Sequence, residues 1–218
     1  MDRSIVAVAA EALVDAGRRL GARGLISAGE GNLSVRLDAD RLLVTPSGSR
    51  KDELTPDGLV VVWLEHGERD DGWGSGNQPT SDLAGHLALY RARPDIRAIA
   101  HAHLPAALAL TLAGELPETS ALAEAALLLP RLPFVPFGVP GSSELAERVA
   151  RAMTEPPEPF PTAALLERHG AVAVGNDPRQ AVDRLEIVEV LCRTWRDALL
   201  LRAARATLGI VPSPSPGG

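Results

Sequence analysis

The stretch DLAGHLALYRARPDIRAIAHAH, residues 82–103, contains the pattern that determines the fold class. Its first half has apolar residues at helical spacing, with Ser81 as a candidate N-cap and Pro94 directly after the expected end at Arg93. Its second half, residues 95–103, alternates in polarity as a β-strand does. A helix followed at once by a strand favours an α/β domain.

The same kind of pattern extends in both directions along the chain. Residues 33–37, 41–45 and 58–64 predict three short strands, and an amphipathic helix precedes them. Downstream we expect a helix from Pro105 to Gly114, a strand at 132–137, a capped helix at 142–153, two strand-like runs joined at His169 and Gly170, and a last helix from about Pro178 towards Leu208. Consecutive strands between helices predict a sheet with many antiparallel neighbours and helices on both faces.

The composition predicts one domain, residues 1–211, with a disordered tail at 212–218. The net charge of −6 argues against a nucleic-acid or anionic-membrane surface but allows a basic pocket for one phosphate. No apolar run is long enough for a membrane span, and the N-terminal run is too interrupted for a signal peptide. The single cysteine, Cys192, is interpreted as a packed thiol. We therefore expect a cytoplasmic protein.

Three histidines form a candidate metal site. In the predicted strand, His101 and His103 point to the same face, which suits two ligands of one ion, although a chance pair at a solvated strand end fits the pattern too. His169 precedes Gly170 at an expected tight turn, where it is a third ligand or an ordinary turn histidine. Three imidazoles would leave one zinc position open, as in catalytic sites.

Asp82 begins the predicted helix, where it is either a helix-dipole partner or a metal ligand and general base. Before it, Thr80 and Ser81 offer hydroxyl and N–H groups suited to an anion. Two loops, residues 29–34 with Asn32 and residues 45–54, have the composition of oxyanion sites, although each is also compatible with a plain turn.

Two further histidines and the single tyrosine are less informative. His86, four residues after Asp82, is interpreted as a packing or supporting histidine rather than a ligand, and His66 as a solvated loop residue. Tyr90 lies within the predicted helix and is expected in the core.

Five pieces in this order resemble the class II aldolase/adducin family. They are GNLSVR, VTPSGSRKDELTPDGL, PTSDLAGHLALYRARPDIRAIAHAH, ERHGAVAVG and the long terminal helix, and together they span about residues 4–206. The resemblance implies a three-layer α/β/α fold with a central, mainly antiparallel sheet. It also implies a homo-oligomer, commonly a tetramer with active sites at subunit interfaces.

Residue roles follow from the same resemblance. His101, His103 and His169 would bind Zn2+, with Mn2+ or Co2+ as alternatives. Asn32, Ser47, Gly48, Thr80 and Ser81 would bind the phosphate of a small phosphorylated sugar, and Asp82 would be catalytic. The chain departs from the aldolase pattern in having aspartate rather than glutamate at 82, as the family's epimerases do. It also lacks the tyrosines that serve as proton donors, because Tyr90 is its only tyrosine.

These features favour a metal-dependent lyase acting through an enediolate, such as a ketose 1-phosphate aldolase. A phosphorylated oxo-acid decarboxylase would pass through the same kind of intermediate. An epimerase or dehydratase is the alternative that Asp82 favours, and a non-catalytic adducin-like interaction module is the alternative outside enzymes. Retention of three histidines argues against the module, because a buried imidazole cluster is costly without a partner.

Overall fold

Seven strands form one mixed sheet in the order β3-β2-β1-β4-β7-β6-β5 in this computed structural model, which describes residues 3–74, 76–155 and 158–209. The strands are β1 (Asn32–Arg36), β2 (Arg41–Val44), β3 (Val60–Trp63), β4 (Ala98–Ala102), β5 (Phe134–Val135), β6 (Ala163–Leu166) and β7 (Gly170–Gly175). Every neighbouring pair is antiparallel except β5 and β6. The expected mainly antiparallel sheet is confirmed.

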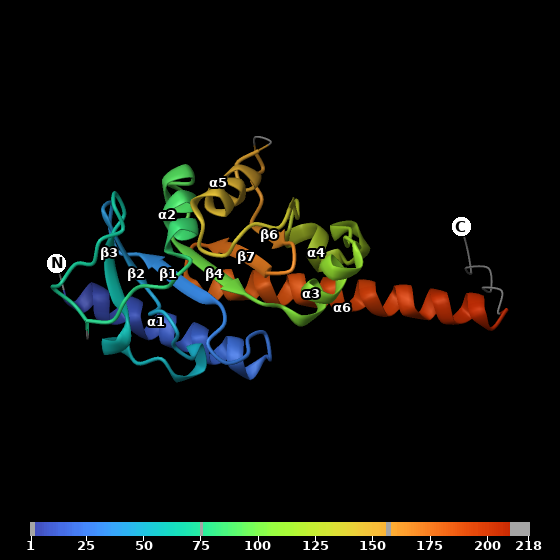
Figure 1. The fold of residues 1–218 in the computed structure, drawn as a ribbon, viewed down its shortest axis with the longest axis horizontal. Coiled ribbons are helices and arrows are strands. Elements are labelled where there is room, and N and C mark those ends of the chain that lie inside the picture. Colours follow the sequence, from blue (N-terminus) through green and yellow to red (C-terminus); the bar gives the residue numbers. More distant parts are fainter. Residues whose placement is uncertain (1–2, 75, 156–157, 210–218) are drawn as a thin grey trace.

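Helices cover both faces of the sheet (Figure 1). They are α1 (Arg3–Ala22), α2 (Leu83–Ala92), α3 (Pro105–Ala113), α4 (Ala123–Leu128), α5 (Ser143–Ala152) and α6 (Pro178–Thr207). Side chains of α1, α3, α4 and α6 pack in one hydrophobic cluster below the sheet, and those of α2 and α5 pack in a second cluster above it. The three-layer arrangement is thus the one that the resemblance implies.

The two faces of β4 explain how the layers form. Ala98, Ala100 and Ala102 are fully buried towards the larger cluster, where α6 crosses the strand. Such small side chains let the long helix approach the sheet closely. Ile99 and His101 point to the opposite face, as alternation along a strand requires.

Three expectations need correction or restriction. The N-cap of α2 is Asp82 and not Ser81, because Ser81 lies in a turn before the helix, closed by a hydrogen bond from the Leu83 N–H to the Thr80 carbonyl at 3.2 Å. Helix α4 was not predicted, and the strand expected at 132–137 is reduced to two residues. The expected tail at 212–218 lies outside the described residues.

Helix α6 continues well past the edge of the sheet (Figure 1). Residues 200–209 are all exposed, including Leu200, Leu201 and Leu208. Among the described residues, no helix combines the length and apolar character that a membrane crossing would need.

Candidate active site

Strand register brings the candidate site together. In the β1–β4 pair Asn32 lies opposite His101, and in the β4–β7 pair His101 lies opposite Val172. His103 follows the end of β4, and His169 occupies the turn from β6 to β7. Three segments distant in sequence therefore meet at one end of the central strands.

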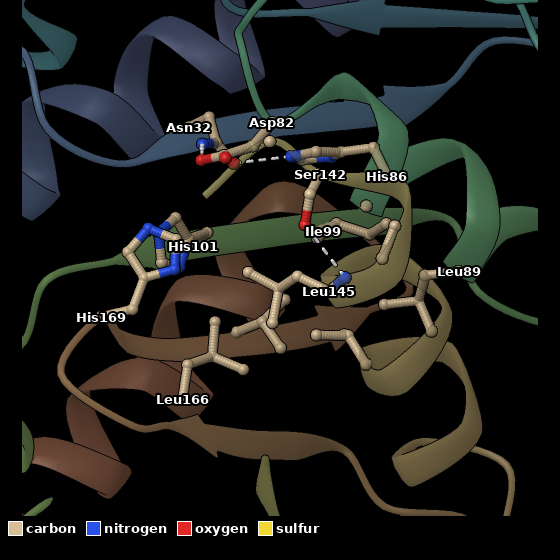
Figure 2. A pocket seen from close by; sticks show the side chains of 15 residues that line it. Asn32, Asp82, His86, Leu89, Ile99, His101, Ser142, Leu145, Leu166 and His169 are labelled. Carbon is tan, nitrogen blue, oxygen red and sulfur yellow. Dashed lines mark hydrogen bonds between the residues drawn. The ribbon is translucent and has the colours of Figure 1, made fainter. Parts of the chain in front are cut away.

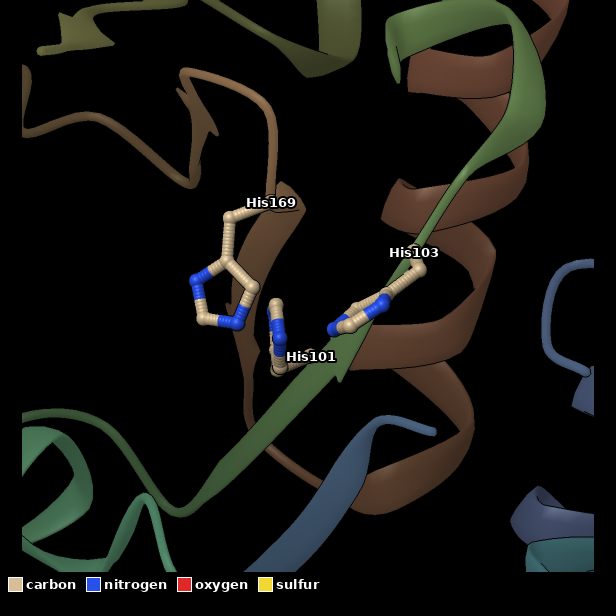
Figure 3. Close-up of side chains that lie close together, drawn as sticks. All are labelled: His101, His103 and His169. Atoms are coloured by element: carbon tan, nitrogen blue, oxygen red, sulfur yellow. The ribbon is translucent and has the colours of Figure 1, made fainter. Parts of the chain in front are cut away.

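The three imidazoles form a compact cluster, which we call the histidine triad (Figure 3). Their ring centroids are 5.1 Å apart for His101 and His103, 4.6 Å for His101 and His169, and 4.9 Å for His103 and His169. One nitrogen from each ring lies within 4.8 Å of the other two. Asp82 and His86 are not part of this group.

Hydrogen bonding leaves ring nitrogens of the triad free for a ligand. The Nδ1–H of His101 donates to the Ala171 carbonyl at 2.9 Å, so its buried Nε2 carries a lone pair with no partner among the described residues. Nδ1 of His169 is also buried and unpartnered within the described part of the chain, and the other nitrogen of this ring, Nε2, faces His101 and His103 (Figure 3). Nδ1 of His103 lies 3.7 Å from a Glu30 carboxylate oxygen. Unpartnered nitrogens on converging rings fit a divalent cation.

The triad is also electrostatically prepared for a cation. Burial, with smaller contributions from the neighbouring rings of His169 and His103, lowers the pKa of His101 to about 3. Burial and His103 lower the pKa of His169 as well. Both rings are therefore neutral near pH 7, which is the form that binds metals.

Gly170 allows the turn to reach the end of β4. Its φ is +102°, and a Cβ atom there would lie 2.2 Å from the Ala102 carbonyl oxygen and 2.7 Å from the His103 Cα. Any side chain at this position would push His169 away from the other two rings. The expectation of a tight turn at Gly170 is confirmed.

Asp82 lies beside the triad and is held by Asn32. The Asn32 Nδ2 atom donates to an Asp82 carboxylate oxygen at 2.8 Å. Burial alone would raise the pKa of Asp82, but the neighbouring imidazoles of His101 and His169 and the Asn32 amide outweigh it, so the pKa lies below its usual range. Asp82 is therefore a carboxylate at neutral pH and can accept a proton.

A polar cavity of about 370 Å³ opens next to the triad. All five residues that the resemblance assigned to phosphate line it, namely Asn32, Ser47, Gly48, Thr80 and Ser81. Lys51 and Arg168 line it as well and could pair with an anion, and the carboxylates of Glu30 and Asp82 are also in its wall. His103 and His169 form its border with the triad.

Lys51 connects the two loops that wall this cavity. Its buried Nζ atom donates to the Gly29 carbonyl at 2.7 Å and to the Ser49 carbonyl at 2.6 Å. Burial lowers the pKa of Lys51, while nearby Asp82 acts in the opposite direction. The third ammonium proton remains available to a bound anion.

A second, smaller cavity of about 50 Å³ lies on the other side of Asp82, below α2 and α5 (Figure 2). Apolar side chains form most of its wall, including Leu89, Ile99, Leu145 and Leu166. Asn32, Asp82 and His169 line both cavities. The site therefore has a polar side and an apolar side that share these three residues.

Sequence reasoning did not assign Glu30, Ser34 or Arg168 to the site. Glu30 stands in a loop named only for its glycines and Asn32. Arg168 directly precedes His169, so its position in sequence could have indicated a place near the metal site. Its left-handed backbone, with φ +55°, cannot be predicted from the sequence. Ser34 shares the face of Asn32 on β1, so strand alternation alone could have identified it.

A family model and several known proteins match most of the chain. The family model described as the class II aldolase and adducin N-terminal domain matches residues 11–196. A 3-oxo-tetronate 4-phosphate decarboxylase from Haemophilus influenzae is 34% identical over 184 residues, which is 82% of each chain. A methylthioribulose-1-phosphate dehydratase from Acidiphilium cryptum is 32% identical, covering 86% of this chain and 89% of the relative.

Solved structures share the fold. The crystal structure of an L-fuculose-1-phosphate aldolase from Thermus thermophilus superposes with a TM-score of 0.72 at 30% identity. The match covers 94% of this chain and 97% of the other. The proteins similar to this chain thus include a decarboxylase, a dehydratase and an aldolase.

Proposed function

Because the chain belongs to the class II aldolase and adducin family, we propose that it is a divalent-metal-dependent lyase acting on a small phosphorylated sugar or sugar acid. The observation that carries the proposal is the juxtaposition of the histidine triad, Asp82 and one polar cavity. The relatives named above act, by their names, on phosphorylated compounds of four or more carbons with adjacent oxygen functions.

His101, His103 and His169 would hold the metal, with Zn2+ as our assignment and Mn2+ or Co2+ as alternatives. When bound, a divalent ion would polarise a substrate carbonyl and stabilise the negative charge of an enediolate. The remaining chemistry falls to the side chains around it.

The substrate phosphate would occupy the polar cavity. Asn32, Ser47, Gly48, Thr80 and Ser81 line this cavity, and Lys51 and Arg168 add cationic groups that could pair with the phosphate oxygens. Binding the phosphate there would fix the substrate with its carbonyl end towards the triad.

Asp82 would handle the proton. As a carboxylate it can take the proton of the substrate hydroxyl next to the carbonyl and later give it to the enediolate carbon, while a proton from solvent restores the hydroxyl. In decarboxylation the carbon–carbon bond to the carboxylate breaks, its electron pair remains with the enediolate, and CO2 leaves without a proton.

The buried position of the single tyrosine, Tyr90, favours decarboxylation over aldol cleavage. Aldol cleavage needs a second group to take the proton of the hydroxyl that becomes a carbonyl. Tyr90 is the only tyrosine of the chain, it is 1% exposed, and its hydroxyl lies 3.0 Å from the Ser34 hydroxyl. Burial raises its pKa further, so it cannot supply this function in its own subunit or in a neighbouring one.

Aldol cleavage of a ketose 1-phosphate is the second candidate, favoured by the 30% identity to the Thermus aldolase. Zinc-loaded protein should be incubated with 3-oxo-tetronate 4-phosphate and, separately, with ketose 1-phosphates. Release of CO2 supports the first reaction, and release of a carbonyl fragment supports the second. Isomers with an unchanged carbon count, a product that has lost water, or no turnover would contradict the proposed cleavage of a carbon–carbon bond.

An adducin-like module without catalysis predicts a different result. Such a protein would contain no stoichiometric metal, and its metal content would not change in His101→Ala. We propose instead one divalent ion per chain, lost in that variant.

We also propose a cytoplasmic homo-tetramer. The exposed leucines of the projecting end of α6 support self-association, because apolar side chains on such a projection gain by being covered. Light scattering on the purified protein tests the assembly, and a monomeric mass would contradict it.

A further inference from the structure

A series of hydrogen bonds runs from Asp82 into the protein through four further residues. Asn32 donates to Asp82, and its Oδ1 lies 2.6 Å from Nε2 of His86. Nδ1 of His86 lies 2.6 Å from the Ser34 hydroxyl, which lies 3.0 Å from the Tyr90 hydroxyl. Asn32 and Ser34 come from β1, His86 and Tyr90 from α2, and Asp82 is the N-cap of α2. Figure 2 shows Asn32, Asp82 and His86 at the pocket.

Only one direction of donation satisfies every member of this chain. The ionised carboxylate of Asp82 accepts only, so the Asn32 NH2 group faces it and the Asn32 carbonyl faces His86. His86 must then donate from Nε2–H and accept at Nδ1. Ser34 gives its only hydroxyl proton to Nδ1, so Tyr90 donates to Ser34 at 3.0 Å, with the Arg97 carbonyl as a longer second acceptor at 3.4 Å.

We propose that His86, backed by Ser34 and Tyr90, is a positioning residue that fixes the orientation of the Asn32 amide. An asparagine amide can rotate by half a turn with little change of shape. Rotated in this way, Asn32 would present its carbonyl to Asp82 and to the proposed phosphate cavity, where two oxygens would repel each other. The Nε2–H of His86 prevents this, because it cannot accept a hydrogen bond from the amide NH2 group.

Asn32 occupies a position at which orientation matters. It is 2% exposed, lies opposite His101 in the sheet, and lines both the polar and the apolar cavity. His86 touches neither the triad nor, by our assignment, the phosphate, so it would act through Asn32. This inference rests on the proposed function, since it gives Asn32 a phosphate to bind.

Substitution of His86 in the zinc-loaded protein tests the inference. His86→Leu removes the donor, whereas His86→Gln can donate to Asn32 and accept from Ser34. We expect His86→Leu to weaken binding of inorganic phosphate, measured by calorimetry, by about 10- to 100-fold, as loss of an orienting partner does. His86→Gln should recover most of the affinity.

Leu87→Ala is the matched control, because Leu87 is buried on the same helix and belongs to the apolar cluster. It should lower the melting temperature but leave phosphate affinity at the wild-type value. Equal affinities for His86→Leu and wild type, or equal losses in His86→Gln and His86→Leu, would overturn the inference. The second result would assign His86 to packing alone.

The tautomer of His86 gives a test that needs neither turnover nor substitution. Nitrogen-15 NMR of histidine-labelled wild-type protein should show a protonated Nε2 and an unprotonated Nδ1 for His86. The opposite tautomer would overturn the inference. Failure of every lyase assay would contradict the proposed reaction, whereas phosphate binding and the tautomer would still decide the role of His86.

Discussion

The two faces of β4 serve different purposes although their residues alternate along one strand. The face below the sheet carries Ala98, Ala100 and Ala102 against α6, without polar side chains. The face above it carries His101, with hydrogen-bonded Asn32 and Ser34 on the adjacent strand. The lower face stabilises the fold by close packing, and the upper face exchanges some packing for an oriented polar cluster.

The largest expected effect on activity comes from removing the His101 side chain from the upper face. His101→Ala should lower kcat/KM more than about 100-fold, because it removes a candidate ligand and not only a supporting group. Its free energy of unfolding without metal should change little, because removal of a buried, unpartnered ring nitrogen offsets the loss of the hydrogen bond to the Ala171 carbonyl. Steady-state kinetics with metal analysis and urea unfolding measure the two quantities. A fully active His101→Ala would remove the upper face from the mechanism.

Ala100→Leu tests the lower face in the same strand. Three further carbon atoms in a fully packed layer should cost about 1–3 kcal/mol of unfolding free energy. Activity per folded molecule should change little, because the side chain points away from the triad. A large loss of kcat at full stability would mean that the two faces are not independent.

Gly170→Ala should affect both stability and metal binding, because Gly170 packs against the backbone of Ala102 and His103 and directly follows His169. The positive φ and the contact with the Ala102 carbonyl predict a loss of about 1–3 kcal/mol in stability. Displacement of His169 should also weaken metal binding, measured by competition with a chelator. Unchanged metal affinity would show that the turn is not what holds His169 in place.

The pH dependence of stability should differ between the faces as well. Burial lowers the pKa of His86 to about 4 from the usual 6.5, so the unfolded chain binds the extra proton first as pH falls. The stability that His86 contributes is complete above pH 6.5 and is lost as the pH falls towards 4, by up to about 1.4 kcal/mol per unit. The free energy of unfolding, measured with urea at several pH values between 4 and 6.5, should depend less steeply on pH in His86→Gln than in the wild type. Parallel slopes would indicate that His86 is charged in the folded protein.

The smallest effects should come from two helix-end serines. Ser142 caps α5 by accepting the Leu145 N–H at 3.2 Å, so Ser142→Ala should cost about 1 kcal/mol. Ser81 is not the cap of α2, so Ser81→Ala should change stability by less than about 0.5 kcal/mol while weakening phosphate binding. Thermal unfolding of both variants and phosphate calorimetry compare them. Equal destabilisation would restore Ser81 as a cap.

The sequence predicted the structure well where the alternation of residues along a strand, or a Pro or Gly at a helix end, determines the local backbone. Alternation along residues 95–103 correctly predicted the common face of Ile99 and His101, and the Pro and Gly signals located α3. It was less informative where distant segments meet. The pairing of Asn32 with His101 depends on strand register, and the approach of His86 to Asn32 depends on how α2 crosses the sheet. Neither leaves a local pattern, so the supporting hydrogen bonds became visible only in three dimensions.

The pairing of Asn32 with His101 also determines where the chain can tolerate changes of length. One residue inserted within β1 or β4 would send Asn32 or His101 to the alanine face and would separate the polar cluster from the triad. The hairpin turn at residues 37–40 and the loop at 64–74 lie outside the paired residues that carry the site. Peptide tags, fluorophores or fused domains should therefore be accepted at these loops with the active site intact.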